Sequence, residues 1–266
     1  NYRELRAELE ALGYRFFSDG DTEVVLKAFH AWGRDCVRRF HGMFAFAVAE
    51  RDSGTLTLAR DRFGIKPLYL AQVPGGLRFG SSLPALLAGG GLDTSIDPVA
   101  LHHYLSWHAV VPPPHTMLAG VRKLEPATVA SWTADGRYEA TRYWDLRVRT
   151  DPALAALPAA ERERLVEDAL RVAVRRRMVA DVPVGVLLSG GVDSSLIVAL
   201  LAEAGQHALS TFSIGFEAAG GEAGDEFAFS DLVAERFGTR HAQIRIPTSD
   251  LLAALPGTVA AMSEPM

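Results

Sequence analysis

A continuous apolar run that breaks into two glycines constrains the fold of this chain more than any other feature. The run VPVGVLL covers residues 182–188, and SGGVDSS follows at 189–195 before the pattern becomes helical. A strand without polar alternation is typical of a parallel sheet that is covered on both faces. Two further strand patterns, at 209–216 and 241–246, alternate with a helix expected at 227–237. The sequence therefore predicts a doubly wound parallel sheet in an α/β fold.

The loop SGGVDSS has the composition of an anion-binding site. Gly190 and Gly191 carry no Cβ, so a ligand can approach their backbone closely. The helix expected at 194–204 would add unpaired N–H groups and the positive end of its dipole. Serine hydroxyls supply further donors. We interpret the loop as a cradle for a pyrophosphate group, and the alternative is an ordinary turn in which Asp193 only caps the helix.

The first half of the chain has a different pattern. Short alternating strands and tight turns between residues 43 and 82 predict an antiparallel meander. Helices are expected before it, at 3–12 and 22–31. A stretch rich in Ala and Pro at 150–160 is the candidate linker to a long helix at 161–179. The chain is therefore expected to hold two structural parts.

Composition and charge exclude several kinds of partner. The net charge of -5 at pH 7 does not favour binding to a nucleic-acid backbone. No stretch reaches the ~18 uncharged apolar residues that span a membrane, so no membrane partner is expected. Cys36 is the only cysteine, which excludes an internal disulfide and favours a reducing, cytoplasmic setting.

Four stretches of the sequence together resemble one protein family. They are GMFAFAV, DRFGIKPLYL, RYWDL and VPVGVLLSGGVDSS. In order and spacing they are similar to the glutamine-dependent asparagine synthetases, and SGGVDSS resembles the PP-loop of ATP pyrophosphatases. The resemblance implies an α/β protein in two parts, both incomplete. Residues 1–150 would form a class II glutaminase, an N-terminal nucleophile-type antiparallel β-sandwich with helices. Residues 155–266 would form a doubly wound, parallel-sheet PP-loop synthetase domain.

The same resemblance implies an activity and its ligands. Glutamine would supply ammonia, and ATP would adenylate a carboxylate that the ammonia then attacks. A Mg²⁺ ion held by Asp193 would offset the phosphate charge. Residues implied to contact ATP or its pyrophosphate are Leu187, Leu188, Ser189, Gly190, Gly191, Asp193, Ser194, Ser195 and Ile214. For Leu187, Leu188 and Ile214 the alternative is an ordinary place in the core of the sheet.

Asp21 is the one glutamine contact that the resemblance places in this chain. Its carboxylate, in GDTEVVL, would pair with the α-ammonium group of glutamine, and the alternative is a helix N-cap. No catalytic residue of the glutaminase is expected in this sequence, because the family's cysteine nucleophile would lie upstream of Asn1. Cys36 lies inside the chain without a free amine and is expected to pack as a small buried residue. Residues of the second half-reaction are expected past Met266.

The acceptor and the activity of the complete protein stay open at this point. Aspartate is the acceptor in asparagine synthetases, whereas LHHYLSWHAVVPPP, FEAAGGEAGDEF and AMSEPM resemble the branch that amidates N-acetylglutaminylglutamine, a small peptide. A PP-loop ligase without glutaminase activity and a non-catalytic nucleotide-binding scaffold are also compatible with the sequence, and so is a homodimer. His241, which opens the last strand pattern, is interpreted as structural.

Overall fold

The computed structural model describes residues 1–206, 208–217 and 224–265. They divide into two compact units, Asn1–Arg147 with Thr258–Met266 and Val148–Gly257. The first unit therefore combines the amino-terminal half of the chain with its last residues.

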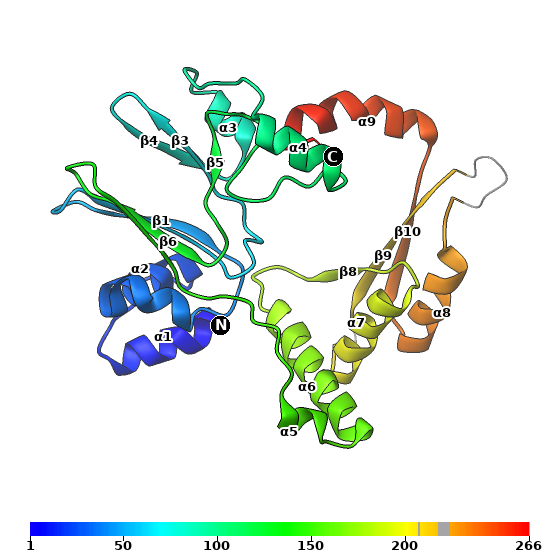
Figure 1. The fold of residues 1–266 in the computed structure, drawn as a ribbon. Coiled ribbons are helices and arrows are strands. Elements are labelled where there is room, and N and C mark those ends of the chain that lie inside the picture. Colours follow the sequence, from blue (N-terminus) through cyan, green and yellow to red (C-terminus); the bar gives the residue numbers. More distant parts are fainter. Residues whose placement is uncertain (207, 218–223, 266) are drawn as a thin grey trace. The chain divides into compact units, whose positions relative to one another are not determined.

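The first unit contains two antiparallel sheets (Figure 1). The first sheet pairs β1 (Ala45–Glu50), β2 (Thr55–Arg60), β6 (Thr128–Trp132) and β7 (Tyr138–Arg142) in this order. The second sheet has the order β4 (Gly76–Gly80), β3 (Tyr69–Val73), β5 (Arg122–Lys123). The helices are α1 (Tyr2–Ala11), α2 (Asp21–Trp32), the 3-10 helix η1 (Gly33–Arg39), α3 (Leu83–Leu87) and α4 (Pro98–Ser106).

Alternation along the strands builds the layers of this unit, because successive side chains of a strand point to opposite faces. In β2, Leu58 packs with Leu68 in the cluster between the two sheets. The next residue, Ala59, belongs to a second cluster, in which residues of α1 and α2, such as Val24, pack against the first sheet. On the outer face of the second sheet, Leu83 of α3 packs against β3. The predicted antiparallel β-sandwich with helices is confirmed (Figure 1).

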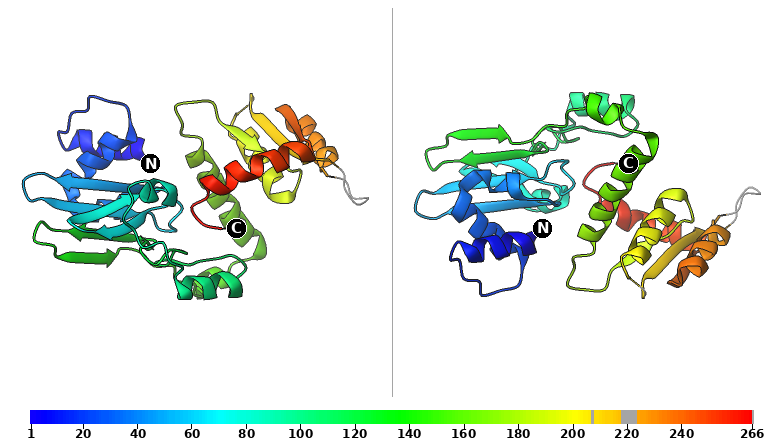
Figure 2. Two further views of the ribbon diagram at one scale, coloured as in Figure 1. Left: turned by 90° about the horizontal axis from the view of Figure 1, so that it is seen from above. Right: turned by 90° about the horizontal axis from the view of Figure 1, so that it is seen from below.

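The second unit is built on a parallel sheet. Its strands are β8 (Gly185–Leu187), β9 (Ser210–Phe216) and β10 (Arg240–Ile246), in the order β10-β9-β8. Helix α7 (Val192–Glu203) follows β8 and α8 (Phe227–Phe237) follows β9, and the two helices pack against each other (Figures 1 and 2). Strand and helix alternate as the sequence predicts, and the mixed α/β class is confirmed.

The strand before the glycine loop is shorter and more exposed than predicted. The apolar run 182–188 predicts a strand buried on both faces, but β8 has three residues and Leu187 is 71% exposed. Val186 and Leu188 point to the opposite face, where they pack against α6 (Ala159–Arg177), α7 and α8. Ile214 and Ile244 on the neighbouring strands are also about half exposed. Within the described residues, helices cover only one face of this sheet.

Three further helices are α5 (Pro152–Ala155), α6 (Ala159–Arg177) and α9 (Thr248–Ala261). Helix α5 lies inside the Ala- and Pro-rich stretch that the sequence suggests as a linker, and the Asp151 carboxylate caps it by accepting from the Ala153 N–H. Among the helices of the described residues, none combines the length and the apolar character needed to cross a membrane.

Candidate functional site

The loop between β8 and α7 gathers hydroxyl groups around one glycine. Gly191 is the N-cap of α7. Ser195 Oγ donates to the Gly191 carbonyl at 2.7 Å, and Ser194 Oγ donates to it at 3.2 Å. Ser189 Oγ accepts from the Gly191 N–H at 3.3 Å and lies 3.1 Å from Ser194 Oγ. The structure thus brings together the three serines that the sequence singled out in this loop.

Gly190 is the position in this loop where only glycine fits. Its φ is +84°, in the left-handed region that side chains rarely adopt. A Cβ at this position would lie 2.5 Å from Phe229 Cβ and 2.6 Å from the Ser230 backbone nitrogen. The first turns of α8 therefore pack directly against the loop, and the missing side chain of Gly190 makes that approach possible.

Asp193 lies in the first turn of α7 and does not cap it. The helix begins at Val192, two residues earlier than predicted, and no side chain caps its N-terminus. The alternative interpretation of Asp193 as an N-cap is therefore wrong. The Asp193 carboxylate is exposed and lies at the positive end of the helix dipole.

A carboxylate in this position suits a Mg²⁺ ion that takes its other ligands from phosphate and water. Ser189 and Ser194 place further oxygen atoms beside it in the loop. Within residues 1–206, 208–217 and 224–265, no group of three or more His, Cys, Asp or Glu side chains could hold a metal ion. Asp193 thus offers one exposed carboxylate in a loop that also carries serine hydroxyls, and both are oxygen donors of the kind that Mg²⁺ prefers.

A cavity of about 300 Å³ opens beside this loop. Two of the residues singled out from the sequence, Ser189 and Ile214, line it. Phe216 also lines it and is two residues from Ile214 on β9, hence on the same face of the strand. Period-two reasoning from Ile214 could therefore have found Phe216. Sequence reasoning missed Ser213 and Ser230, whereas the remaining lining residues, Gly224, Asp225, Glu226 and Phe227, belong to the stretch FEAAGGEAGDEF.

Leu187 and Leu188 differ in what they can contact. Leu187 is exposed on the open face of the sheet, whereas Leu188 is 1% exposed and packs with Val198 of α7. The Leu188 side chain therefore has its place in the core of the sheet. Its carbonyl accepts a hydrogen bond from the Ser213 hydroxyl, so only its backbone lies at the entrance to the loop.

A second cavity, of about 440 Å³, lies in the first unit. Asp21, Lys66 and Ser81 line it. The N-cap of α2 is Gly20 and Asp21 is the first helical residue, so the alternative of Asp21 as a cap is wrong. An exposed carboxylate and an exposed ammonium group in one cavity can pair with the two charged groups of an amino acid. The remaining lining residues are Thr22, Val25, Met43, Phe44, Ala45, Phe46 and Pro67.

Asp61 holds the segment that carries Lys66. Its carboxylate is buried and accepts from the backbone N–H groups of Phe44, Phe63, Ile65 and Lys66 at 3.0 to 3.3 Å. The adjacent Arg60 guanidinium donates to the carbonyls of Gly64, Lys66 and Leu124. Arg60 and Asp61, the last residue of β2 and the first residue of DRFGIKPLYL, therefore fix a loop that has no strand or helix to satisfy its backbone.

Two family models match the chain. The glutamine amidotransferase domain matches residues 1–144, and asparagine synthase matches residues 165–266. The chain belongs to the glutamine-dependent asparagine synthetase family.

Curated members of the asparagine synthetase family show how much of a complete protein this chain covers. The glutamine-hydrolyzing asparagine synthetase 1 of Bacillus subtilis (strain 168) is 39% identical over 223 residues, which are 83% of this chain and 34% of that protein. A protein of Mycobacterium tuberculosis (strain H37Rv), named provisionally as a glutamine-hydrolyzing asparagine synthetase, is 39% identical over 271 residues, 100% of this chain and 41% of its own length. The chain therefore spans less than half the length of these relatives.

Among solved structures, the glutamine phosphoribosylpyrophosphate amidotransferase from B. subtilis, complexed with ADP and GMP, aligns with 91% of this chain and 43% of its own. The identity is 13% and the TM-score is 0.37.

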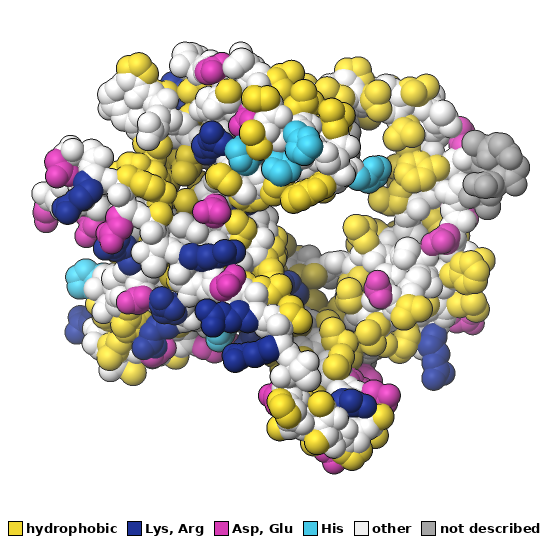
Figure 3. Space-filling view, in the orientation of Figure 1, with side chains coloured by type: hydrophobic (Ala, Val, Ile, Leu, Met, Phe, Trp, Pro, Cys, Tyr) yellow, Lys and Arg dark blue, Asp and Glu magenta, His cyan; other side chains and the backbone are white. Residues whose placement is uncertain are grey.

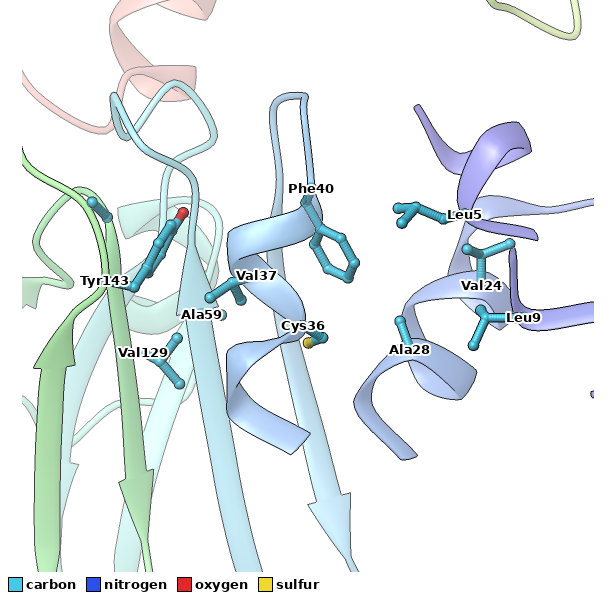
Figure 4. Close-up of a cluster of buried hydrophobic side chains, with 11 residues drawn as sticks. Leu5, Leu9, Val24, Ala28, Cys36, Val37, Phe40, Ala59, Val129 and Tyr143 are labelled. Carbon is cyan, nitrogen blue, oxygen red and sulfur yellow. The ribbon is translucent and has the colours of Figure 1, made fainter. Parts of the chain in front are cut away.

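Cys36 is unsuited to serve as the nucleophile of an amidotransferase. It lies within the cluster formed by α1, α2, η1 and the first sheet (Figure 4), with no exposed surface. Burial raises the pKa of its thiol to about 12, so the reactive thiolate is scarce at neutral pH. The prediction that Cys36 packs as a small buried residue is confirmed.

Histidine side chains gather over α4 (Figure 3). The His103 ring lies 4.8 Å from the Trp107 ring and 6.0 Å from the His115 ring, between centroids. His115 Nδ1 in turn lies 3.1 Å from a carboxylate oxygen of Asp97, the N-cap of α4. Through these contacts, His103 and His115 take part in the packing of α4.

Two of the stretches that resemble the peptide-amidating branch are only partly described. Residues 218–223 of FEAAGGEAGDEF and residue 266 of AMSEPM lie outside the described residues.

Proposed function

We propose that the complete protein is a glutamine-hydrolysing, ATP-dependent amide ligase of the asparagine synthetase type. Glutamine hydrolysis supplies ammonia in a glutaminase domain that includes residues 1–150. A synthetase domain that includes residues 155–266 transfers AMP from ATP to a carboxylate and releases pyrophosphate. Ammonia then displaces AMP, a proton is lost, and an amide forms. The acceptor is the carboxylate of aspartate or of a small peptide.

The arrangement around Gly191 carries this proposal. Hydroxyl and N–H groups at the N-terminus of α7 suit phosphate oxygens, and they lie beside a cavity whose walls include Ile214 and Phe216. Donors for phosphate next to apolar walls are what a nucleotide needs. In this proposal residues 189–195 contact the pyrophosphate part of ATP, and Ile214 contacts the adenine. Asp193 holds Mg²⁺, which offsets the charge that the phosphates carry.

The cavity of the first unit supports the glutamine part of the proposal. Asp21 and Lys66 line the same cavity and have the charges that recognise the α-ammonium and α-carboxylate groups of glutamine. Recognition of both groups selects a free amino acid over a peptide or a simple amide.

An Asp193→Asn variant of the complete protein tests the proposal. Pyrophosphate release from ATP is measured with glutamine and with aspartate or small peptides as acceptors. We expect kcat/KM for ATP to fall by about 100-fold, on the order of the loss when a charged stabilising group is removed. Glutamine hydrolysis without ATP should be retained.

Asp181→Asn is the matched control, because Asp181 is also an exposed aspartate near β8 but lies outside the loop of residues 189–195. Its kinetics should stay close to those of the unmodified protein. Unchanged pyrophosphate release by the Asp193→Asn variant would contradict the assignment of the loop.

A further inference from the structure

His241 is a histidine of β10 that does not line the cavity beside the glycine loop. It is the second residue of β10, and its side chain is 10% exposed. Its ring touches the neighbouring strand β9 at two places. Nδ1 lies 2.8 Å from the Thr211 hydroxyl, and Nε2 lies 3.2 Å from the Ser213 hydroxyl. Both hydroxyl-bearing residues are buried.

The direction of these hydrogen bonds follows from proton counting. Ser213 Oγ donates its one proton to the Leu188 carbonyl. The contact between Ser213 Oγ and His241 Nε2 therefore needs a proton on Nε2. A neutral ring with that proton accepts at Nδ1 from the Thr211 hydroxyl. Thr211 Oγ1 can then accept from Thr239 Oγ1, 2.7 Å away.

The result is one chain of hydrogen bonds in which each group donates to the next: Thr239, Thr211, His241, Ser213 and finally the Leu188 carbonyl. The donation from Nε2 to Ser213 is the same for a neutral and for a protonated ring, because both forms carry a proton on Nε2. Asp231 is a charged group near the ring, with a carboxylate oxygen 3.8 Å from Nε2. That carboxylate is 57% exposed and also accepts from the Gln243 side chain at 2.7 Å, so it does not displace Ser213 as the partner of Nε2.

This chain of hydrogen bonds ends at the Leu188 carbonyl, directly before the glycine loop. The Leu188 N–H still donates to the Phe212 carbonyl of β9, at 2.8 Å, whereas its carbonyl is held by a side chain. Leu188 is followed directly by Ser189, which contributes to the loop and to the cavity wall. The Ser213 hydroxyl therefore fixes the direction in which the polypeptide leaves the sheet at Leu188. His241, by donating to Ser213 Oγ, fixes the orientation of that hydroxyl.

We propose that His241 is a positioning residue for the pyrophosphate loop, acting through Ser213 and the Leu188 carbonyl. This inference rests on the proposed function for its effect on ATP, but its effect on the loop itself does not depend on that function. His241 does not itself line the cavity, and its contact with Ser213 is the link through which its replacement would perturb the loop. Ser213 is a less suitable position for a test, because it lines the cavity.

Two replacements of His241 separate its Nε2 donor from its bulk. In His241→Gln the amide nitrogen stands as many bonds from Cβ as Nε2 does and can donate to Ser213. In His241→Asn the amide nitrogen stands where Nδ1 was, so Ser213 loses its donor. Thr239→Val is the control at the far end of the chain, because it leaves the bond to Ser213 in place.

The test compares these three variants with the unmodified protein, all as complete polypeptides with matched melting temperatures. Amide exchange of residues 189–193 is followed without ligand by mass spectrometry, and KM for ATP is measured through pyrophosphate release. We expect faster exchange and a KM raised about five- to tenfold in His241→Asn, the size of one lost hydrogen bond. His241→Gln and Thr239→Val should stay within about twofold for both readouts.

Equal behaviour of the Gln and Asn variants in loop exchange would overturn the inference, whatever the kinetics. If the unmodified protein releases no pyrophosphate from ATP, the proposed function is wrong, while the exchange experiment still decides whether His241 positions the loop. A loop that loosens in the Asn variant alone supports the inference in either case.

Discussion

At the scale of single residues, Glu23 holds the turn that leads into Asp21. Its carboxylate is buried and accepts from the backbone N–H groups of Phe17 and Ser18, from the Ser18 hydroxyl and from Lys27. Burial alone would raise the pKa of Glu23, but these donors lower it from 4.5 to about 2. The ionised form is thus the one that the fold requires.

Glu23→Gln should remove a pH-dependent part of the stability of the first unit. Since the folded pKa of Glu23 is below its unfolded value, the ionised carboxylate contributes stability above about pH 5, and this contribution is lost as the pH falls towards 2. Urea unfolding across this range should show a variant that is less stable at neutral pH and approaches the unmodified protein in acid. Glu4→Gln, on the exposed side of α1, is the control. A constant difference between Glu23→Gln and the unmodified protein at every pH would contradict this account.

The residues that the sequence could predict are those whose neighbours along the chain share their role. Ser189, Ser194 and Ser195 lie within one loop, and local geometry brings them together at Gly191. Lys66 and His241 could not be found in this way. Lys66 shares a cavity with Asp21, and His241 contacts Ser213, but each pair is distant in sequence and is brought together by the packing of helices and sheets.

At the scale of elements, the chain's last residues pack into the first unit. Lys123 of β5 is 9% exposed at its side chain and donates to Glu264 Oε2 and to the Val111 carbonyl, both at 2.6 Å. The Leu83 N–H at the start of α3 donates to Ser263 Oγ at 3.2 Å. The asparagine synthase family model covers residues 165–266, so Ser263 and Glu264, which that model matches, pack in the same unit as residues 1–144, which the glutamine amidotransferase domain model matches.

Lys123→Met should destabilise the first unit, because it leaves the Glu264 carboxylate without its cation. The other oxygen, Glu264 Oε1, is buried and has no hydrogen-bond partner within the described residues. We expect a loss of roughly 2–4 kcal/mol in the free energy of unfolding, somewhat below the full cost of breaking a buried pair because the Glu264 side chain is 24% exposed.

Denaturant unfolding measures this loss, with Arg142→Met as the matched control. The pair of Arg142 and Asp145 is exposed on both sides and should be worth less than about 1 kcal/mol. The double variant Lys123→Met, Glu264→Gln should recover much of the loss. Additive losses in the double variant would show that the two side chains act independently.

The hydrophobic pattern of the strands predicts part of their arrangement and misses part of their burial. The alternation of β2 and the parallel direction of β8, β9 and β10 follow from periodicity and from the alternation of strand and helix. The exposure of Leu187 does not, because an apolar run predicts cover on both faces of a strand, whereas the described helices pack on only one face of this sheet. Sequence pattern predicts which side chains can be buried, and the covering element decides which of them are.

At the scale of the whole molecule, the two candidate sites lie in different compact units. The cavity with Asp21 and Lys66 belongs to the first unit, and the cavity with Ser189 and Ile214 belongs to the second. Each unit has its own apolar clusters. A ligand stabilises the part of a protein that its contacts order, so the two ligands should leave separate footprints.

Hydrogen exchange of the complete protein, with each ligand alone, tests this separation. ATP with Mg²⁺ should slow amide exchange in residues 186–198 and 210–217, which form the loop and the strand beside the cavity. Glutamate, which keeps both charged groups of glutamine and is not hydrolysed, should slow exchange in residues 17–25 and 66–81. Asp193→Asn should reduce the first footprint and Asp21→Asn the second, each without changing the other. ATP protection of residues 17–25 in the absence of glutamate, or its persistence in Asp193→Asn, would show that the nucleotide binds elsewhere.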